Sequence, residues 1–214
     1  MSVKAYIMIN VKTGTEDAVC EKVLKFNEVE EAAAIYGEFD LVIKVKAKDI
    51  QAVVNWSVEP AQSLVAKNMR QIGMEQPLFQ SHGFGNISYV TAAGKAAEGI
   101  IFPAGRLLVA DVLADSHPQK SLLAAYKKDY ESRYNEEVST FGGHAYDALL
   151  VLQAAVEKAK SVESEKVRSA IEGLQGLVGT AGIFNMSAAD HNGLGLDSFE
   201  MLTVREGRFA RRKP

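Results

Sequence analysis

The sequence predicts an α/β protein, because segments with apolar residues at every second position are interleaved with segments of helical periodicity. In the first segment the apolar positions are Val3, Ala5, Ile7, Ile9 and Val11, which is the period of a half-buried strand. Beyond residue 50, short apolar segments and longer helical segments follow one another at the spacing of parallel βαβ units. Strands and helices are therefore expected to alternate along most of the chain.

The first part of the chain is expected to contain a strand, a helix and a hairpin. Thr15 before the acidic pair Glu16-Asp17 is typical of a helix start, and the helix is expected at residues 16–26. Two further strands are expected at residues 31–36 and 40–45, because the three residues between them have the length of a hairpin turn.

The second part is expected to begin with strand-helix repeats and to continue with helices. The expected strands are residues 52–56, 77–80 and 99–103, and the expected helices between them are residues 57–73 and the segment after the loop 81–86. Three further helices are expected at residues 119–134, 143–159 and 164–174, the second after a break at Gly142-Gly143. The chain is expected to end in β structure at Ile183-Phe184 and in two strands joined by a turn at Glu206-Gly207.

Composition and charge exclude several classes of partner. The 214 residues are 47% hydrophobic, which is enough for a buried core, and the net charge of -3 offers no basic face to a nucleic acid. The single cysteine, Cys20, allows no internal disulfide and is expected to be a small buried residue. No apolar run approaches the roughly 20 residues of a membrane span, and the start lacks the features of a signal peptide. As written, the chain is expected to be soluble and cytoplasmic, without membrane insertion.

The residues that could support catalysis do not form a catalytic pattern. Gly83 and Gly85 follow a strand but lack the third glycine of a dinucleotide fingerprint. His144 and Asp147 share a helix face, yet no second His or Cys stands at helical spacing, so structural hydrogen bonds are the favoured interpretation. The polar segment 190–197 is expected to be a turn because it lacks the ligand pattern of a calcium loop. We therefore expect no enzyme, no cofactor and no metal site.

Residues 1–49 resemble the amino-acid effector domain of the Lrp/AsnC regulators. The resemblance rests on Lys4-Ala-Tyr-Ile-Met-Ile-Asn-Val-Lys-Thr-Gly and on Tyr36-Gly-Glu-Phe-Asp-Leu-Val-Ile-Lys-Val-Lys-Ala, which contains the Gly-x-x-Asp element of Gly37 and Asp40. It implies a ferredoxin-like βαββ segment in which Gly37 and Asp40 lie beside an effector pocket. Glycine lets backbone approach a ligand, and a carboxylate can pair with an α-ammonium group, although both residues also suit an ordinary turn and strand start.

Residues 50–214 resemble the C-terminal part of the solute-binding proteins of branched-chain amino-acid ABC transporters, a normally periplasmic family. The matching stretches include Ala52-Val-Val-Asn-Trp-Ser-Val-Glu-Pro-Ala-Gln, Ser81-His-Gly-Phe-Gly-Asn and Gly143-His-Ala-Tyr-Asp-Ala. The resemblance implies a type I periplasmic-binding-protein-like lobe of βαβ units with a helical C-terminal part. The family closes two lobes on a ligand, and the half that supplies most of the first lobe has no counterpart here.

This second resemblance implies ligand contacts from the loops after the strands, where crevices form in parallel sheets. Those loops carry Trp56 and Ser57 and then His82, Gly83 and Phe84. Trp56 and Phe84 would enclose an apolar side chain, and amides at a helix start near Ser57 would bind a carboxylate. A buried indole, a simple helix cap and a loop histidine are the alternatives. Tight recognition requires another surface to close over these loops.

The sequence therefore predicts a non-catalytic protein that binds or senses a small molecule, either an amino acid with a branched-chain or aromatic side chain or a related carboxylate. One alternative is an oligomeric regulatory or assembly module, in which the first segment pairs with copies of itself. Another is a chimera of two gene fragments without a selected function.

Overall fold

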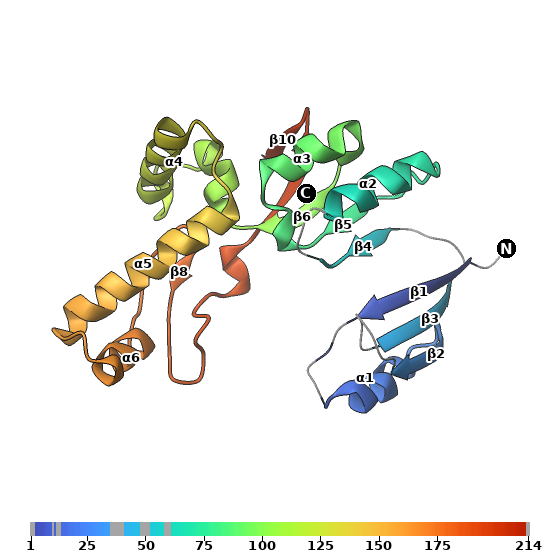
Figure 1. Ribbon diagram of the computed structural model, residues 1–214, viewed down its shortest axis with the longest axis horizontal. Helices are drawn as coiled ribbons and strands as arrows, with labels where there is room; N and C mark the ends of the chain where they lie inside the picture. Colours follow the sequence, from blue (N-terminus) through green and yellow to red (C-terminus); the bar gives the residue numbers. More distant parts are fainter. Residues whose placement is uncertain are drawn as a thin grey trace. The chain divides into compact units, whose positions relative to one another are not determined.

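The computed structural model describes residues 3–9, 11, 14–34, 41–47, 52–57 and 61–212 (Figure 1). The chain forms two compact units, Met1–Ala52 and Val53–Pro214. Among the described strands no sheet is shared between the units: the first unit has a three-stranded sheet, and the second has a five-stranded and a two-stranded sheet.

The first unit is a three-stranded antiparallel sheet with one helix. Its elements are β1 (Val3–Ile9), α1 (Glu16–Val23), β2 (Val29–Ala34) and β3 (Leu41–Ala47). The strand order is β1-β3-β2, so β3 lies in the middle and pairs with both of its neighbours. The expected order of strand, helix and hairpin is confirmed, and it is the βαββ arrangement of a ferredoxin-like segment.

Helix α1 ends earlier than its sequence pattern predicts. The last helical residue is Val23, and Phe26 lies in the following turn with its side chain 64% exposed. The amides of Lys25 and Phe26 donate to carbonyls three residues back, the pattern of a tightened last turn. The expectation that Cys20 is buried is wrong, because its side chain is only half-buried on a helix without fully buried residues.

The second unit is built on a five-stranded mixed sheet. Its strands are β4 (Val53–Asn55), β5 (Leu78–Gln80), β6 (Ile101–Ala104), β9 (Glu200–Arg205) and β10 (Arg208–Arg211), in the order β10-β9-β6-β5-β4. Strands β4, β5 and β6 are parallel, and β9 and β10 form an antiparallel hairpin at the other side. The predicted βαβ units and the predicted terminal strand pair are both confirmed.

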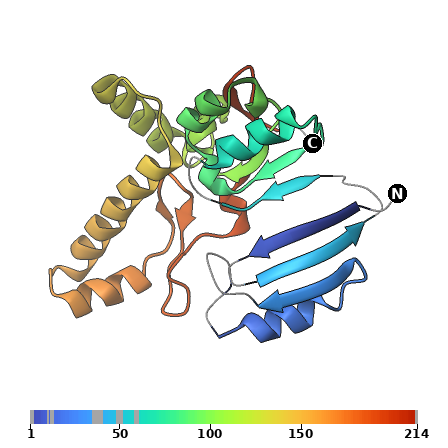
Figure 2. The same ribbon diagram turned by 45° about the vertical axis from the view of Figure 1, so that its right-hand side comes forward.

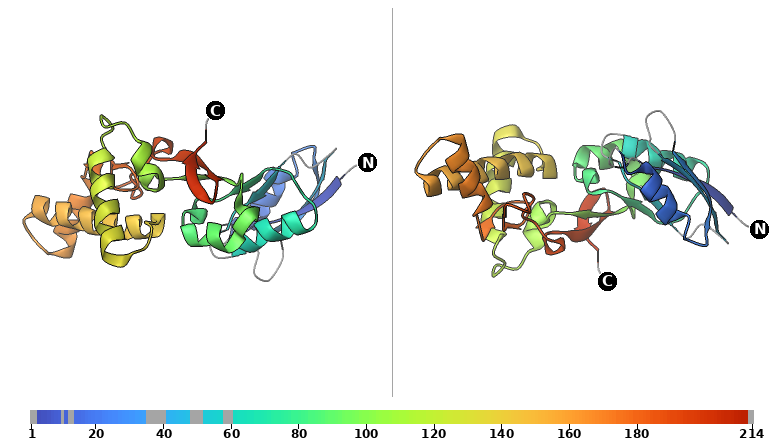
Figure 3. Two further views of the ribbon diagram at one scale, coloured as in Figure 1. Left: turned by 90° about the horizontal axis from the view of Figure 1, so that it is seen from above. Right: turned by 90° about the horizontal axis from the view of Figure 1, so that it is seen from below.

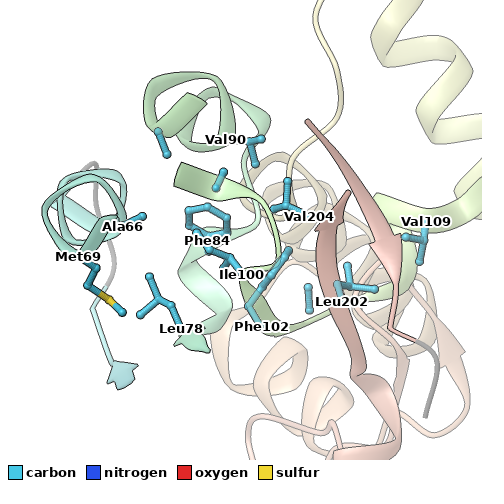
Figure 4. Close-up of a cluster of buried hydrophobic side chains, with 13 residues drawn as sticks. Ala66, Met69, Leu78, Phe84, Val90, Ile100, Phe102, Val109, Leu202 and Val204 are labelled. Atoms are coloured by element: carbon cyan, nitrogen blue, oxygen red, sulfur yellow. The ribbon is translucent and has the colours of Figure 1, made fainter. Parts of the chain in front are cut away.

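Two helices cover one face of this sheet, as Figure 3 shows in green. They are α2 (Ala61–Gln71) and α3 (Ile87–Ala93), which bury Ala66, Met69, Val90 and Ala93 against the strands. In this core Phe102 meets the ring of Phe84 edge-on, at 5.3 Å between ring centroids (Figure 4). The partly buried ring of Phe209 contacts Phe102 in a tilted arrangement, also at 5.3 Å. Each fully buried large side chain contributes about 1.5–3 kcal/mol, so this cluster stabilises the unit.

Between β6 and β9 the chain leaves the sheet and forms a helical part (Figure 2). Its elements are the 3-10 segment Arg106–Val112, α4 (Lys120–Tyr134), α5 (Thr140–Ala159), α6 (Ser164–Glu172), β7 (Leu177–Val178) and β8 (Ile183–Phe184). The buried carboxylate of Asp147 on α5 accepts bonds from the amides of Thr180 and Ala181, at 2.6 and 2.8 Å, and from the Thr180 hydroxyl at 3.0 Å. This confirms the structural role expected for Asp147, which ties α5 to the β7–β8 turn.

The expectation that Gly142 and Gly143 form a break before the helix is wrong, because both residues lie inside α5. Helix α5 already begins at Thr140, and the side chain of Ser139 accepts the amide of Gly142 at 3.2 Å as its cap. A Cβ at Gly143 would lie 2.6 Å from the Thr180 hydroxyl oxygen and 2.8 Å from a methyl of Leu107. Gly143 is therefore needed for close packing inside the helix and does not end it.

We expect Gly143→Ala to destabilise the protein by about 1–3 kcal/mol, although alanine favours helix more than glycine does, because the added methyl overpacks the contact with Thr180. The matched control is Gly142→Ala, because the nearest atom to its Cβ would be the hydroxyl at the end of the Tyr126 side chain, at 3.0 Å, and its other neighbours lie at 3.7 Å or more. Urea unfolding of both variants measures the difference. Equal stability of the two variants would show that this contact does not constrain position 143.

Candidate functional site

The loops that follow β4 and β5 lie at the same edge of the sheet. Strands β4 and β5 are parallel with Asn55 opposite Gln80, so the next residues of both strands emerge together. The rings of Trp56 and His82 consequently approach to 6.4 Å between centroids, with an edge-on angle of 60°. The structure thus brings together two of the residues that the sequence singled out.

A network of hydrogen bonds from three largely buried side chains, Gln62, Gln80 and Ser81, holds these loops in place. The side-chain amide of Gln80 accepts a hydrogen bond from the Asn55 side chain at 2.7 Å and donates one to the backbone carbonyl of Gln62 at 2.9 Å. The side chain of Gln62 in turn donates to the Ser57 carbonyl at 2.9 Å and to the Ser81 hydroxyl at 3.1 Å. Strand ends and helix α2 are therefore fastened to one another beneath Trp56 and His82.

The sequence argument missed Gln62 and Gln80. Both lie in segments whose periodicity indicates only a helix or strand, and glutamine is mostly exposed in proteins. The one available signal was the polar Gln80-Ser81 pair at the end of an otherwise apolar strand. The hydrogen-bond partner of Gln80, Asn55, is identified only when strands β4 and β5 are seen to pair.

The backbone carbonyl and the side-chain hydroxyl of Ser57 differ in their hydrogen bonds. Its carbonyl accepts from Gln62 and from the Ser81 hydroxyl. Its own hydroxyl, and the side-chain oxygen of Gln62, are buried without a hydrogen-bond partner among the described residues. Helix α2 is described from Ala61 onward, so the helix-start amides expected to follow Ser57 lie outside the described residues.

The predicted site residues differ sharply in exposure. Trp56 is 74% exposed and His82 is exposed, whereas Gly83 is buried and Phe84 is 0% exposed. The prediction that Phe84 forms a ligand wall is wrong, because its ring packs against Phe102 in the core. Phe84 supports the loop from beneath. Gly37 and Asp40, the two site residues predicted in the first unit, lie outside the described residues.

A small pocket lies beside His82, where the chain crosses between the sheet and the helical part. It is lined by His82, Ala104, Gly105, Thr140, His144, Ala181, Leu194, Ser198 and Phe199. Its volume of about 30 Å³ suits one or two waters and is too small for an amino acid. The neighbouring Trp56 and His82 side chains lie on open surface outside this pocket.

Other polar clusters have structural roles. The carboxylate of Asp190 accepts the amides of Asn192 and Gly193 at 2.9 and 3.2 Å, which confirms the turn expected there. Residues 3–9, 11, 14–34, 41–47, 52–57 and 61–212 contain no group of three potential metal ligands. Across the same described stretches, no helix has the length and apolar character to cross a membrane.

A sheet with three parallel strands, loops at their carboxyl ends and a helical excursion that returns to the same sheet is the arrangement of a type I periplasmic-binding fold. The model of the periplasmic binding protein family matches residues 39–199, more than half of the chain. The chain belongs to this family, which consists of solute-binding proteins and is normally periplasmic. The model of the Lrp/AsnC ligand binding domain matches residues 4–56.

Individual relatives agree with this assignment. The leucine-, isoleucine-, valine-, threonine- and alanine-binding protein of Pseudomonas aeruginosa is 27% identical over 131 residues, which are 61% of this chain and 33% of that protein. An extracellular ligand-binding receptor from Rhodopseudomonas palustris HaA2 has a TM-score of 0.72 at 25% identity, covering 76% of this chain and 48% of the receptor.

A Streptococcus pneumoniae branched-chain amino acid transporter substrate-binding protein, solved with isoleucine, has a TM-score of 0.63. Its identity of 23% shows the fold alone, over 76% of this chain and 43% of that protein. The chain thus spans a third of the curated relative and about half of the solved ones.

We expect Gln80→Ala to destabilise the protein by about 1–3 kcal/mol, because it leaves Asn55 and the Gln62 carbonyl without their partner. Trp56 is the only tryptophan, so its fluorescence reports the loop directly and should shift in the variant. Thermal unfolding and emission spectra test this, with the exposed Gln153→Ala as the matched control, expected within about 0.5 kcal/mol of the parent. A Gln80→Ala protein that matched this control in both measurements would contradict the positioning role of the network.

Proposed function

We propose that this protein binds or senses an amino acid, with a branched-chain or aromatic side chain, or a related carboxylate, without chemical turnover. The observation that carries the proposal is the pairing of Trp56 with His82 at the carboxyl ends of two parallel strands. This is the edge at which parallel α/β sheets bind ligands. The name of the Pseudomonas relative, a leucine-, isoleucine-, valine-, threonine- and alanine-binding protein, supports the choice of ligand class.

Each residue has a distinct role in the proposed site. The exposed indole of Trp56 offers an apolar face to the ligand side chain. The exposed imidazole of His82 carries ring nitrogens that can form hydrogen bonds, so it can bind a polar group of the ligand. The Ser57 hydroxyl, buried without a partner among the described residues, supplies a donor for the ligand carboxylate after a small movement of the loop. Gly83 is buried in the 3-10 turn His82–Phe84, and it would let the backbone approach the ligand closely.

The exposure of Trp56 implies that recognition is shared with a second surface. An indole that is 74% exposed buries too little ligand area to hold a small molecule tightly, since binding sites enclose most of the ligand surface. We infer that the ligand is retained when another polypeptide surface closes over the loops of β4 and β5. Residues 1–49 form a separate amino-acid effector-like module in this proposal, with residues 50–214 as the binding-protein-like module.

Calorimetric titration with branched-chain amino acids, aromatic amino acids and aromatic carboxylic acids tests the ligand assignment. We expect saturable binding of at least one of these classes, accompanied by a change in Trp56 fluorescence. Trp56→Ala and His82→Ala should each weaken binding by about tenfold or more, because both remove direct ligand contacts.

The matched control is His191→Ala, which removes an exposed histidine from the turn near α6 and should leave the affinity unchanged. Absence of heat and of fluorescence change across the whole panel would remove the ligand-binding proposal. Broad, non-cooperative thermal melting of the parent protein would instead support a composite of two gene fragments.

A second candidate function, oligomeric assembly through the first unit, is favoured by its match to the Lrp/AsnC ligand binding domain. Strand β1 is an edge of the described sheet and carries Ile7, whose side chain is 45% exposed. Exposed apolar residues on a sheet edge favour pairing with another chain.

If the first unit drives assembly, light scattering should show a ligand-independent oligomer whose mass falls to that of a single chain in Ile7→Lys, because a charge on an edge strand opposes pairing. Phe26→Lys, in the turn after α1, is the control and should retain the oligomer. A parent protein that is monomeric at all concentrations would exclude this function.

A further inference from the structure

Two histidines from segments far apart in the sequence line the small pocket at the junction of the sheet and the helical part. His82 lies in the loop after β5, and His144 lies near the start of α5. Both residues line the cavity, whose volume is about 30 Å³. The ring of His82 is also 6.4 Å from that of Trp56, between centroids, so the pocket adjoins the exposed edge that carries the proposed ligand site.

The other residues that line the pocket are apolar or carry a hydroxyl group. They are Ala104, Gly105, Thr140, Ala181, Leu194, Ser198 and Phe199. No acidic residue is found among the described residues of this lining. An imidazole ring carries at least one N–H in either protonation state, so the two histidines offer two hydrogen-bond donors to an oxygen atom.

Carboxylates that are close to the pocket in the sequence have partners elsewhere. Asp147, three residues after His144, accepts three hydrogen bonds from the β7–β8 turn. Glu200, at the start of β9, forms ion pairs with two arginines, at 3.1 and 3.0 Å. The carboxylate of Asp197 lies beside Gly195, where a Cβ would be 2.6 Å from its Oδ1 atom. None of these three carboxylates lines the pocket, so none is placed to neutralise a cation bound there.

The chemistry of this lining discriminates between an ammonium group and a carbonyl oxygen. An α-ammonium group carries a positive charge and three N–H donors, so its burial without a carboxylate partner is unfavourable. The oxygen of an α-keto group is uncharged and accepts hydrogen bonds, which suits two imidazole donors. The cavity has room for one or two waters, and a single carbonyl oxygen can take the place of one of them. The pocket therefore fits a carbonyl oxygen better than an ammonium group.

We propose that the pocket lined by His82 and His144 binds the carbonyl oxygen of an α-keto acid, and that this protein prefers α-keto acids to the amino acids with the same side chains. The inference rests on the proposed function, because it narrows the ligand class of the same site. The ligand side chain lies on Trp56 and its carboxylate binds near Ser57, as in the proposed site. His144 is then a specificity-determining residue that distinguishes the two classes of ligand.

Calorimetric titrations of the full chain with paired ligands measure this preference. Leucine is compared with its α-keto acid, and phenylalanine with phenylpyruvate, so that only the group on the α-carbon differs within each pair. Within any pair that binds, we expect the keto acid to bind about tenfold or more tightly than the amino acid, because the amino acid buries an ammonium group without an acidic partner.

Three substitutions of His144 separate a specific role from a structural one. His144→Ala should weaken keto acid binding by about tenfold, because it removes a donor to the carbonyl oxygen. His144→Asn keeps an N–H donor and should retain most of the affinity. His144→Asp should weaken keto acid binding and strengthen amino acid binding, because its carboxylate can pair with the ammonium group. A residue that only stabilises the fold would not change the order of preference within a pair.

His191→Ala is the matched control, since it removes an exposed histidine outside the pocket and should leave both affinities unchanged. Thermal unfolding shows that each variant folds. Equal or tighter binding of the amino acid overturns the inference and leaves the proposed function intact, and so does a keto acid preference that persists undiminished in His144→Ala. If none of the four compounds binds, the inference fails, and the wider ligand panel then shows whether the proposed function fails with it.

Discussion

The buried network of Gln62, Gln80 and Ser81 is the constraint on which the rest of the site depends. Parallel pairing of β4 and β5 brings two loops to one edge of the sheet, but short strands alone leave those loops free to move. The hydrogen bonds to Asn55 and Ser57 fasten both strand ends to α2. In a low-dielectric interior such bonds are costly to break, because each partner would be left buried and unsatisfied.

The hydrophobic core supports this network, and residues of the loop after β5 have different roles. Phe84 faces inward against Phe102 and anchors the loop, while His82, two residues earlier, faces solvent beside Trp56. Because a buried side chain anchors this loop, the loop can expose polar and aromatic side chains and keep its conformation. A buried polar side chain has a similar role in the helical part, where the Asp147 carboxylate accepts two amides of the β7–β8 turn and so holds that turn against α5.

Two exposed surfaces characterise the second unit. One is the edge of the sheet that carries Trp56 and His82, and the other is the side of α5 that carries Phe141, Leu149 and Leu152. The first surface is aromatic and the second is largely apolar.

The sequence by itself determined the α/β class, the order of nearly every element and the two family resemblances, because alternating and helical periodicities are local properties of the chain. It also placed Trp56 and His82 at strand ends. Only the tertiary structure decided that Phe84 belongs to the core, that Gly143 lies inside α5, and that Gln62 and Gln80 hold the loops. These facts depend on contacts between residues far apart in the chain, such as Gly143 with Thr180, and no local pattern specifies such contacts.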